Sequence, residues 1–513
     1  MTKVSKKVLL NLLCLVGTSS SFHTNFNSRN SVGIHRNVPG QRTCNSSTDI
    51  SVLKNALSMD DVDPPVTQSQ LDPKDAWIAN LDYETFARDV SELGKELRSS
   101  TGDADVDHLN KIVQWRNIAA ILGLATIWIA PNPITVVALS TWTYSSWAMI
   151  AHHTCHGGYN RVDAGRYNSR KFALGLVNRF VDWLDWMQPE AWNVEHNRLH
   201  HYNLNEGKDP DLVQRNLGFL RDDKRIPMLF KYATVLMFLP IWKWFYYAPN
   251  TFKELKINEM LKSSEGKEEG VFPQDFDREQ AVTVASLLDP FSFQARAMRK
   301  VVPPHQLFLK VLGPMLIGRY LAIPALLFVL VPGGMGSVVA AHAFWNLLAA
   351  ELLTNIHAFA TIVTNHAGED LYTFDGSVKP NSGSFYVRQI VGSTNYDAGT
   401  DLVDFSHGFL NYQIEHHVWP DLSMLQYQRG APKLKAICEK HGVPYIQENV
   451  LERLRKTVDI MVGRTTMREF PTTAYEPSSD RMVFATVGTG GGSSGGRSAY
   501  WKSTNGAIDE QEW

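Results

Sequence analysis

The chain has 513 residues, a formal net charge of −2 and four cysteines. The nearly neutral charge argues against nucleic acid as a partner, and the cysteines are too scattered for a zinc ribbon or a disulfide framework. The mean hydropathy of −0.20 averages polar ends with a very apolar middle. Fourteen tryptophans suit a protein with membrane interfaces.

Residues 1–48 form a predicted targeting segment. Residues 1–21 combine three lysines with the apolar run VLLNLLCLV and a stretch of small residues, which is the pattern of a signal peptide. Residues 22–48 contain Arg, Ser and Asn but no acid, which is transit-peptide composition. Together they resemble the two-part presequence of secondary plastids. We therefore expect a plastid membrane, with the endoplasmic reticulum as the alternative. Residues 49–105 follow as a polar N-terminal region.

Four apolar runs are predicted to cross the membrane as two helical hairpins. The first pair, 118–130 and 134–151, flanks a Pro-Asn-Pro turn, and the second pair, 307–331 and 338–363, flanks PGGMGS. Each run is near the length of roughly 17–25 residues that crosses the hydrocarbon core. Both hairpins belong to a predicted membrane domain over residues 106–470. A low-complexity tail, 471–513, follows and is expected to be disordered.

A further apolar stretch, 228–249, is predicted to lie in the membrane interface. It contains Lys231 and Lys243, and a lysine at mid-span costs about 2.5–3.5 kcal/mol on the insertion scale. If this stretch crossed, the second hairpin would start on the opposite side from the first histidine clusters. An in-plane amphipathic helix keeps all of them on one side. The charged residues 251–300 are expected to form an insertion on the solvent side.

Three histidine clusters lie beside these runs: HHTCHGGYN after the first hairpin, EHNRLHH in the polar segment that follows, and QIEHH after the second hairpin. His152 and His156 are four residues apart, as are His196 and His200, so each pair shares one face of a helix. The candidate metal ligands are His152, His156, His196, His200, His201, His366, His416 and His417.

Eight imidazoles on four segments provide enough ligands for two metal ions. All-nitrogen ligation with few thiolates suits iron, zinc or copper rather than magnesium or calcium. A ligating histidine usually donates its second N–H to a carboxylate or a carbonyl. The candidates for an additional ligand or for such a supporting contact are His153, His357, Gln413, Glu195, Asp209 and Glu415.

The three clusters resemble the histidine boxes of the membrane fatty-acid desaturase superfamily. In this sequence the boxes read His152-x3-His156, His196-x3-His200-His201 and Gln413-x2-His416-His417. The glutamine of the third box is similar to that of front-end and related acyl-lipid desaturases. The resemblance implies an all-α membrane protein: four transmembrane helices in two hairpins, interfacial helices, and a helical cap that holds a di-metal site. It also implies two iron ions, O2 as co-substrate, and His366 as a further ligand.

The resemblance implies oxygen-dependent desaturation of the acyl chain of a membrane lipid. The sequence carries no His-Pro-Gly-Gly motif of a fused cytochrome b5, so ferredoxin or free cytochrome b5 is the expected electron donor. Two alternatives stay open: a di-iron hydroxylase or ketolase acting on a carotenoid or other lipid, and a non-enzymatic membrane protein that binds metal or haem. The boxes do not determine chain length, double-bond position or the carrier of the acyl group.

Overall fold

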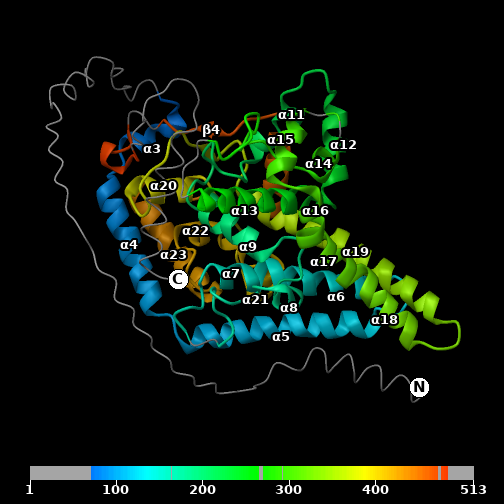
Figure 1. The fold of residues 1–513 in the computed structure, drawn as a ribbon. Helices are drawn as coiled ribbons and strands as arrows, with labels where there is room; N and C mark the ends of the chain where they lie inside the picture. Colours follow the sequence, from blue (N-terminus) through cyan, green and yellow to red (C-terminus); the bar gives the residue numbers. More distant parts are fainter. Residues whose placement is uncertain are drawn as a thin grey trace, which may run out of the picture. The chain divides into compact units, whose positions relative to one another are not determined.

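The structure is a computed structural model that describes residues 71–162, 165–264, 270–289, 291, 293–471 and 475–482. The chain divides into Met1–Asp72 and Pro73–Trp513, and every element named below belongs to the second unit. This unit is mostly helical, as the sequence predicts (Figure 1). The predicted targeting segment and most of the predicted tail lie outside the described residues.

The first predicted hairpin consists of α5 (Asp103–Thr126) and α6 (Pro133–Tyr144), which pack side by side. α6 continues without a break through a π-helical segment, η4 (Ser145–Ala151), into α7 (His152–Cys155). One uninterrupted helix therefore leads from the hairpin turn to the first histidine box.

Local sequence explains the turn and the close packing of this hairpin. Asn132 caps α6 by accepting a hydrogen bond from the backbone N–H of Thr135 at 3.0 Å, and proline occupies the first helical position. Gly123 allows α5 and α6 to approach, because a Cβ there would lie 2.7 Å from Leu139 Cδ2. A larger residue at this position would force the two helices apart.

The second predicted hairpin consists of a helix over Pro304–Leu330 and of α19 (Gly336–Ile362), which continues into η10 (Val363–Asn365). Both helices are long and apolar enough to cross a membrane by length and composition. The first contains two π-helical segments, each just before a proline (Pro314 and Pro324), whose ring and missing N–H disfavour α-helical closure. Its parts are α16 (Pro304–Leu307), η8 (Phe308–Leu312), α17 (Gly313–Met315), η9 (Leu316–Ala322) and α18 (Ile323–Leu330).

The stretch predicted to lie in the interface contains α12 (Met228–Phe238), whose 11 residues are fewer than the roughly 17 that span a bilayer. In Figure 1, α12 runs across the direction of α5. Several of its apolar side chains are exposed: Leu229, Phe230, Leu236 and Met237. This length and exposure fit a helix in the membrane plane, which remains a prediction.

A buried charge network ties the second hairpin to the segment before the second histidine box. Lys243 Nζ lies 2.5 Å from Asp185 Oδ2 and 3.5 Å from Glu351 Oε1, and all three side chains are buried. The Trp186 indole also donates to Glu351 Oε1 at 2.8 Å. Burial of Lys243 is therefore compensated by two carboxylates, and the network joins α19 to the loop that leads to the box.

The expectation of a solvent-side insertion at 251–300 is wrong for its first part. α13 (Ala248–Ser263) packs against α9 (Pro189–Trp192) and against η6 (Asn193–His200), the π-helix of the second box. Two of its buried polar residues bond to backbone carbonyls: Lys253 Nζ donates to Arg278 at 2.9 Å, and the Asn250 amide donates to Val282 at 2.6 Å. Charge along the sequence suggested exposure, whereas the folded backbone supplies these groups with buried partners.

The cap consists of helices that surround the third histidine box. The box lies on α22 (Gln413–Val418), which is flanked by α20 (Gly383–Val391) and α23 (Met424–His441). α4 (Tyr83–Ser99), from the region predicted to be polar, packs on α23. Its buried face consists of Phe86, Val90, Leu93 and Leu97, which follow helical spacing.

Four two-residue strands connect C-terminal segments to loops near the boxes. β1 (Tyr372–Thr373) pairs in parallel with β4 (Arg468–Glu469), and β2 (Asn395–Tyr396) pairs in parallel with β3 (Gln447–Glu448). The register places Tyr372 opposite Arg468 and Asn395 opposite Gln447. The other described elements are η3 (Pro73–Asp75), α3 (Ala76–Ala79), α8 (Leu176–Asn178), η5 (Arg179–Trp183), α10 (Val213–Asn216), α11 (Gly218–Arg221), η7 (Lys243–Tyr247), α14 (Val284–Leu288), α15 (Phe293–Val301), α21 (Asp401–Ser406), η11 (Leu410–Tyr412), α24 (Val450–Met461) and η12 (Ser478–Asp480).

Residues 475–482, which the sequence assigns to a disordered tail, are held against the cap. The backbone N–H of Lys379 donates to the carbonyl of Asp480 at 2.7 Å, and the Asp480 carboxylate accepts from the backbone N–H of Ser384 at 3.2 Å. Glu476 pairs with the buried Arg388 at 2.9 Å. Low-complexity composition begins beyond these residues, so the predicted tail starts too early.

Candidate metal centre

The first histidine box lies where the first hairpin enters the cap. His152 opens α7 directly after the π-helical segment, and His156 follows one turn later, its N–H donating to the carbonyl of His152 at 3.2 Å. The two ring centroids lie 5.0 Å apart. His152 and His156 therefore lie on the same face, as their spacing predicts.

The second box lies on η6, whose π-helical winding changes which residues face each other. The N–H of His201 donates to the carbonyl of His196 five residues earlier, at 3.2 Å. This wider turn brings His196 Nε2 within 3.3 Å of His201 Nε2, while His200 stacks beside His196 at 5.1 Å. The three imidazoles of this box therefore lie close together, with His201 opposite His196 and His200 beside it.

The third box sends its two adjacent histidines to different places. His416 Nε2 lies 2.9 Å from His152 Nε2. The His417 ring lies 4.7 Å from that of His366 and 5.1 Å from that of His200. The two side chains diverge because successive residues on a helix point about 100° apart, and their ring centroids lie 5.6 Å apart.

Seven of the candidate ligands form two all-histidine groups in which the ligand nitrogens all lie within 4.8 Å of one another, and a third group of the same kind, His196, His200 and Asp211, links the two. The first histidine group is His152, His156, His196 and His416. The second histidine group is His200, His366 and His417. His201 lies between them, with its ring 4.4 Å from that of His156 and stacked on His417 at 4.3 Å.

The candidate ligands include buried ring nitrogens that lack a hydrogen-bond partner within the described part of the chain. Five of the eight candidate ligands have a buried ring nitrogen without a hydrogen-bond partner among the described residues: His156, His196, His201, His366 and His417. An unsatisfied buried polar group costs about 1–3 kcal/mol. Metal ligation would satisfy ring nitrogens that have no other partner, so these residues fit such a role.

Burial keeps most of these imidazoles in the form that binds metal. Burial and neighbouring imidazoles hold the pKa of seven of them well below the ordinary value of 6.5: His152, His156, His196, His201, His366, His416 and His417. His200 differs: burial would lower its pKa, but the nearby Asp209 carboxylate raises it. Neutral imidazoles are ready to bind a metal without first losing a proton.

Comparison with known proteins agrees with this geometry. The sequence model of the fatty acid desaturase family matches residues 126–449, which contain all three boxes. The chain belongs to the fatty acid desaturase family. It is therefore an oxidoreductase of the fatty-acid desaturase type.

Relatives from distant organisms carry desaturase names. The chain is 22% identical over 426 residues to an NADPH-dependent stearoyl-CoA 9-desaturase of Mycobacterium tuberculosis, covering 81% of this chain and 88% of the relative. A shorter match, 27% over 124 residues, covers 24% of this chain and 27% of an acyl-lipid (8-3)-desaturase of Rebecca salina. Fatty acid desaturase 3 of Bos taurus matches at 49% over 44 residues, 9% of this chain and 10% of the relative. No solved structure matches.

Two side chains bond to histidines of this desaturase. Asp209 Oδ1 accepts from His200 Nδ1 at 2.9 Å, and its Oδ2 accepts from the backbone N–H of Asn205 at 2.8 Å. Gln413 Nε2 lies 3.0 Å from His366 Nε2. Asp209 thus bonds to a candidate ligand, and Gln413 contacts a member of the second histidine group.

The other supporting candidates have different surroundings. His153 Nδ1 donates to the carbonyl of Met149 at 2.7 Å, and its ring lies 5.7 Å from that of His416. His357 stacks on Tyr144 and donates to the carbonyl of Ser406 at 2.6 Å, outside both groups. The two acidic candidates, Glu195 and Glu415, bond to residues other than histidine.

Glu195 and Glu415 are buried beside the boxes. Burial, with nearby Asp211, raises the pKa of Glu195 well above its ordinary value. Tyr247 donates to Glu195 at 3.4 Å. Glu415 accepts from Asn395 at 2.9 Å and from the Tyr445 hydroxyl at 2.8 Å, which pins α22 to its neighbours.

Sequence reasoning missed two supporting residues on neighbouring helices. Gln389 Oε1 accepts from His417 Nδ1 at 3.1 Å, and its amide donates to the carbonyl of His201 at 3.0 Å. The Tyr427 hydroxyl lies 3.3 Å from His416 Nδ1. A glutamine on the apolar face of a short helix was a usable signal for Gln389, whereas nothing near Tyr427 in the sequence marks it.

Proposed function

We propose that the chain is an oxygen-dependent membrane fatty-acyl desaturase that holds two iron ions in its two histidine groups. The observation that carries the proposal is the convergence of buried, partly unsatisfied imidazoles from four segments. Bound there, iron would supply the oxidising chemistry with which the family uses O2 and two electrons to remove two hydrogens from an acyl chain. His201, between the groups, would act beside both ions.

The chain's own residues hold this site in a fixed and dry geometry. Asp209 and Gln389 orient His200 and His417 by hydrogen bonds to their Nδ1 atoms. Trp192 stacks on His196 with ring centroids 4.4 Å apart, and Trp192 is buried. Such fixed imidazoles need little reorganisation during reaction, which favours precise placement of an acyl CH2–CH2 unit.

We propose that both hairpins cross the membrane and that α12 lies in its surface. The support is the exposed apolar surface on the helices of both hairpins: Ile118, Leu122, Ile134, Val137, Ile317, Leu321, Val329 and Trp345. Large exposed apolar surface needs a lipid or protein partner. Two complete hairpins return the chain to the side on which the histidine boxes lie.

We also propose a plastid membrane location and a separate electron donor. The location is supported by the composition of residues 1–48, and the endoplasmic reticulum remains the alternative. The Mycobacterium relative is named NADPH-dependent. In a plastid, ferredoxin would deliver the two electrons, and elsewhere free cytochrome b5 would do so. Residues 106–470 would form the membrane domain.

Lipid analysis of a heterologous host tests the proposal. Expression of the full chain should yield an acyl product two hydrogens lighter than its precursor, and His417→Ala should abolish it. His305→Ala is the matched control, since this exposed histidine lies outside both groups. A product that has gained oxygen would favour a hydroxylase or ketolase. An unchanged lipid profile, with zinc or haem in place of iron, would contradict the proposal.

A further inference from the structure

The loop that carries His366 is held from behind by one helix, α24. This loop runs from η10 to β1, and α24 lies directly beyond residue 449, where the family match ends. Thr457 Oγ1 donates to the carbonyl of Ala367 at 2.9 Å, and Arg453 Nη2 donates to the same carbonyl at 3.2 Å. Two side chains of α24 therefore donate hydrogen bonds to the carbonyl of the residue that follows His366.

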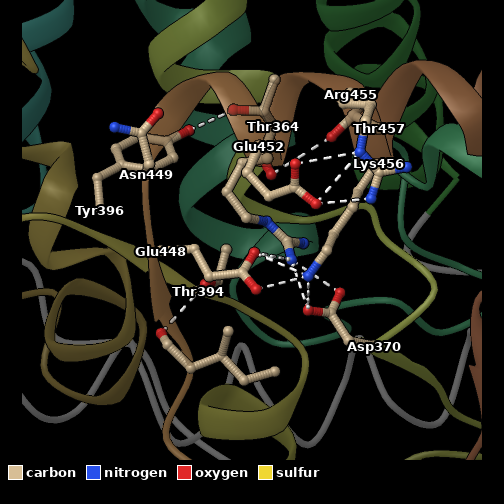
Figure 2. Close-up of polar contacts among 12 residues, drawn as sticks. Thr364, Asp370, Thr394, Tyr396, Glu448, Asn449, Glu452, Arg455, Lys456 and Thr457 are labelled. Carbon is tan, nitrogen blue, oxygen red and sulfur yellow. Dashed lines mark hydrogen bonds and ion pairs between the residues drawn. The ribbon is translucent and has the colours of Figure 1, made fainter.

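Arg453 also locks the far end of this loop. Its Nη1 donates to both carboxylate oxygens of Asp370 at 2.7 Å. Lys456 bridges Asp370 at 2.8 Å and Glu448 at 2.6 Å (Figure 2). Burial alone would raise the pKa of Asp370, but Arg453 and Lys456 hold it below its ordinary value. The ion pair thus keeps its charge although the Arg453 side chain is fully buried.

Gly368 packs closely against the side chains of Arg453 and Asp370. A Cβ at this position would lie 2.4 Å from Arg453 Nη2 and 2.6 Å from Asp370 Oδ1. The Arg453 guanidinium thus lies directly against the loop backbone, between the two loop residues to which it bonds, Ala367 and Asp370. Movement of the loop would break both of these Arg453 contacts together.

The front of the loop meets the second histidine group. The His366 ring lies 4.9 Å from that of His200 and 4.7 Å from that of His417. Among the candidate ligands, His366 is the one supplied by a segment without a second ligand. Gln413 of the third box contacts its ring at 3.0 Å, but no second ligand on the same segment fixes its backbone, which depends on the contacts of its own loop.

We infer that Arg453 and Thr457 are positioning residues that set His366 into the second histidine group, so that α24 is an integral part of the metal centre. The inference rests on the proposed role of His366 as a ligand. Without Arg453, the described hydrogen bonds from α24 to this loop and to the end of η10 are the Thr457 contacts to Ala367 and Thr364 and the Lys456 contact to Asp370. The second histidine group should then lose one of its three members, while the first group keeps all four.

The test measures iron bound to the purified full chain in detergent. We expect about two irons per chain in the parent protein and about one, a twofold loss, in both Arg453→Met and His366→Ala. Arg455→Met is the matched control: this arginine is on the same helix, but its partners are Glu452 and Asp459 and its side chain is half exposed. It should keep both irons (Figure 2 shows Arg455 beside Glu452).

A double variant separates positioning from general destabilisation. If Arg453 acts through His366, adding Arg453→Met to His366→Ala should cost no further iron. If Arg453→Met does not fold, two variants of Thr457 test the positioning role instead. Thr457→Val should lose iron. Thr457→Ser keeps the hydroxyl and should keep both irons.

Each outcome has one meaning. The positioning role would be overturned if Arg453→Met, or a folded Thr457→Val, bound two irons per chain while His366→Ala bound fewer. Additive loss in the double variant would overturn it as well. Two irons per chain in His366→Ala would instead show that His366 is not a ligand and would contradict the proposed function.

Discussion

At the scale of single residues, adjacency in sequence and adjacency in the site are different things. His416 and His417 are neighbours in the chain, yet one faces His152 and the other faces His366. His200 belongs to the second histidine group, whereas its neighbour His201 lies between the groups, beside His156 and His417. Each doubled histidine therefore serves both sides of the site, which explains why two boxes end in a pair.

Asp209 offers the sharpest test at this scale. Asp209→Asn keeps the size of the side chain but replaces a charged acceptor of the His200 N–H by a neutral one. Because supporting carboxylates orient a ligand and raise its basicity, iron affinity or turnover should fall about 10–100-fold. Iron titration and product formation measure the effect. Asp222→Asn, at an exposed site in the same polar segment, should behave as the parent. Equal behaviour of the two variants would contradict the role of Asp209.

At the scale of elements, the sequence located the helices of both hairpins and the three boxes, since these depend on local patterns. It did not reveal the π-helical winding of η6, which brings His201 opposite His196. Helical winding depends on the packing around the segment, here α9 and α13. The burial of α13 and the contact of Gln389 with His417 were also out of reach, because both join residues far apart in sequence.

The position of α12 is a testable property of an element. If α12 lies in the membrane plane, residues before and after it face the same side, while the tip of the second hairpin faces the other. Single cysteines at Asp222, Glu259 and Met335, which are exposed, should react accordingly with a membrane-impermeant maleimide in sealed vesicles. Cys14 and Cys44 are replaced by serine, and Cys155 and Cys438 are buried. Labelling of positions 222 and 259 from opposite sides would show that α12 crosses.

At the scale of the whole molecule, the site joins parts that would otherwise be separate. The first group takes ligands from the end of the first hairpin, from η6 and from α22 of the cap, and the second group adds the end of the second hairpin. Buried imidazoles without partners oppose folding when no metal is present. Metal binding should therefore stabilise the hairpins and the cap together.

Thermal unfolding with and without iron tests this coupling. A ligand that binds the folded state at 100 times its Kd stabilises it by about 2.7 kcal/mol, so the iron-loaded protein should have a higher Tm than the chelated protein. His366→Ala should show a smaller increase, because the second histidine group is incomplete. Asp222→Asn, which leaves both groups intact, should show the full increase. Equal Tm values for the iron-loaded and chelated parent protein would mean that the histidines do not bind the metal in the folded state.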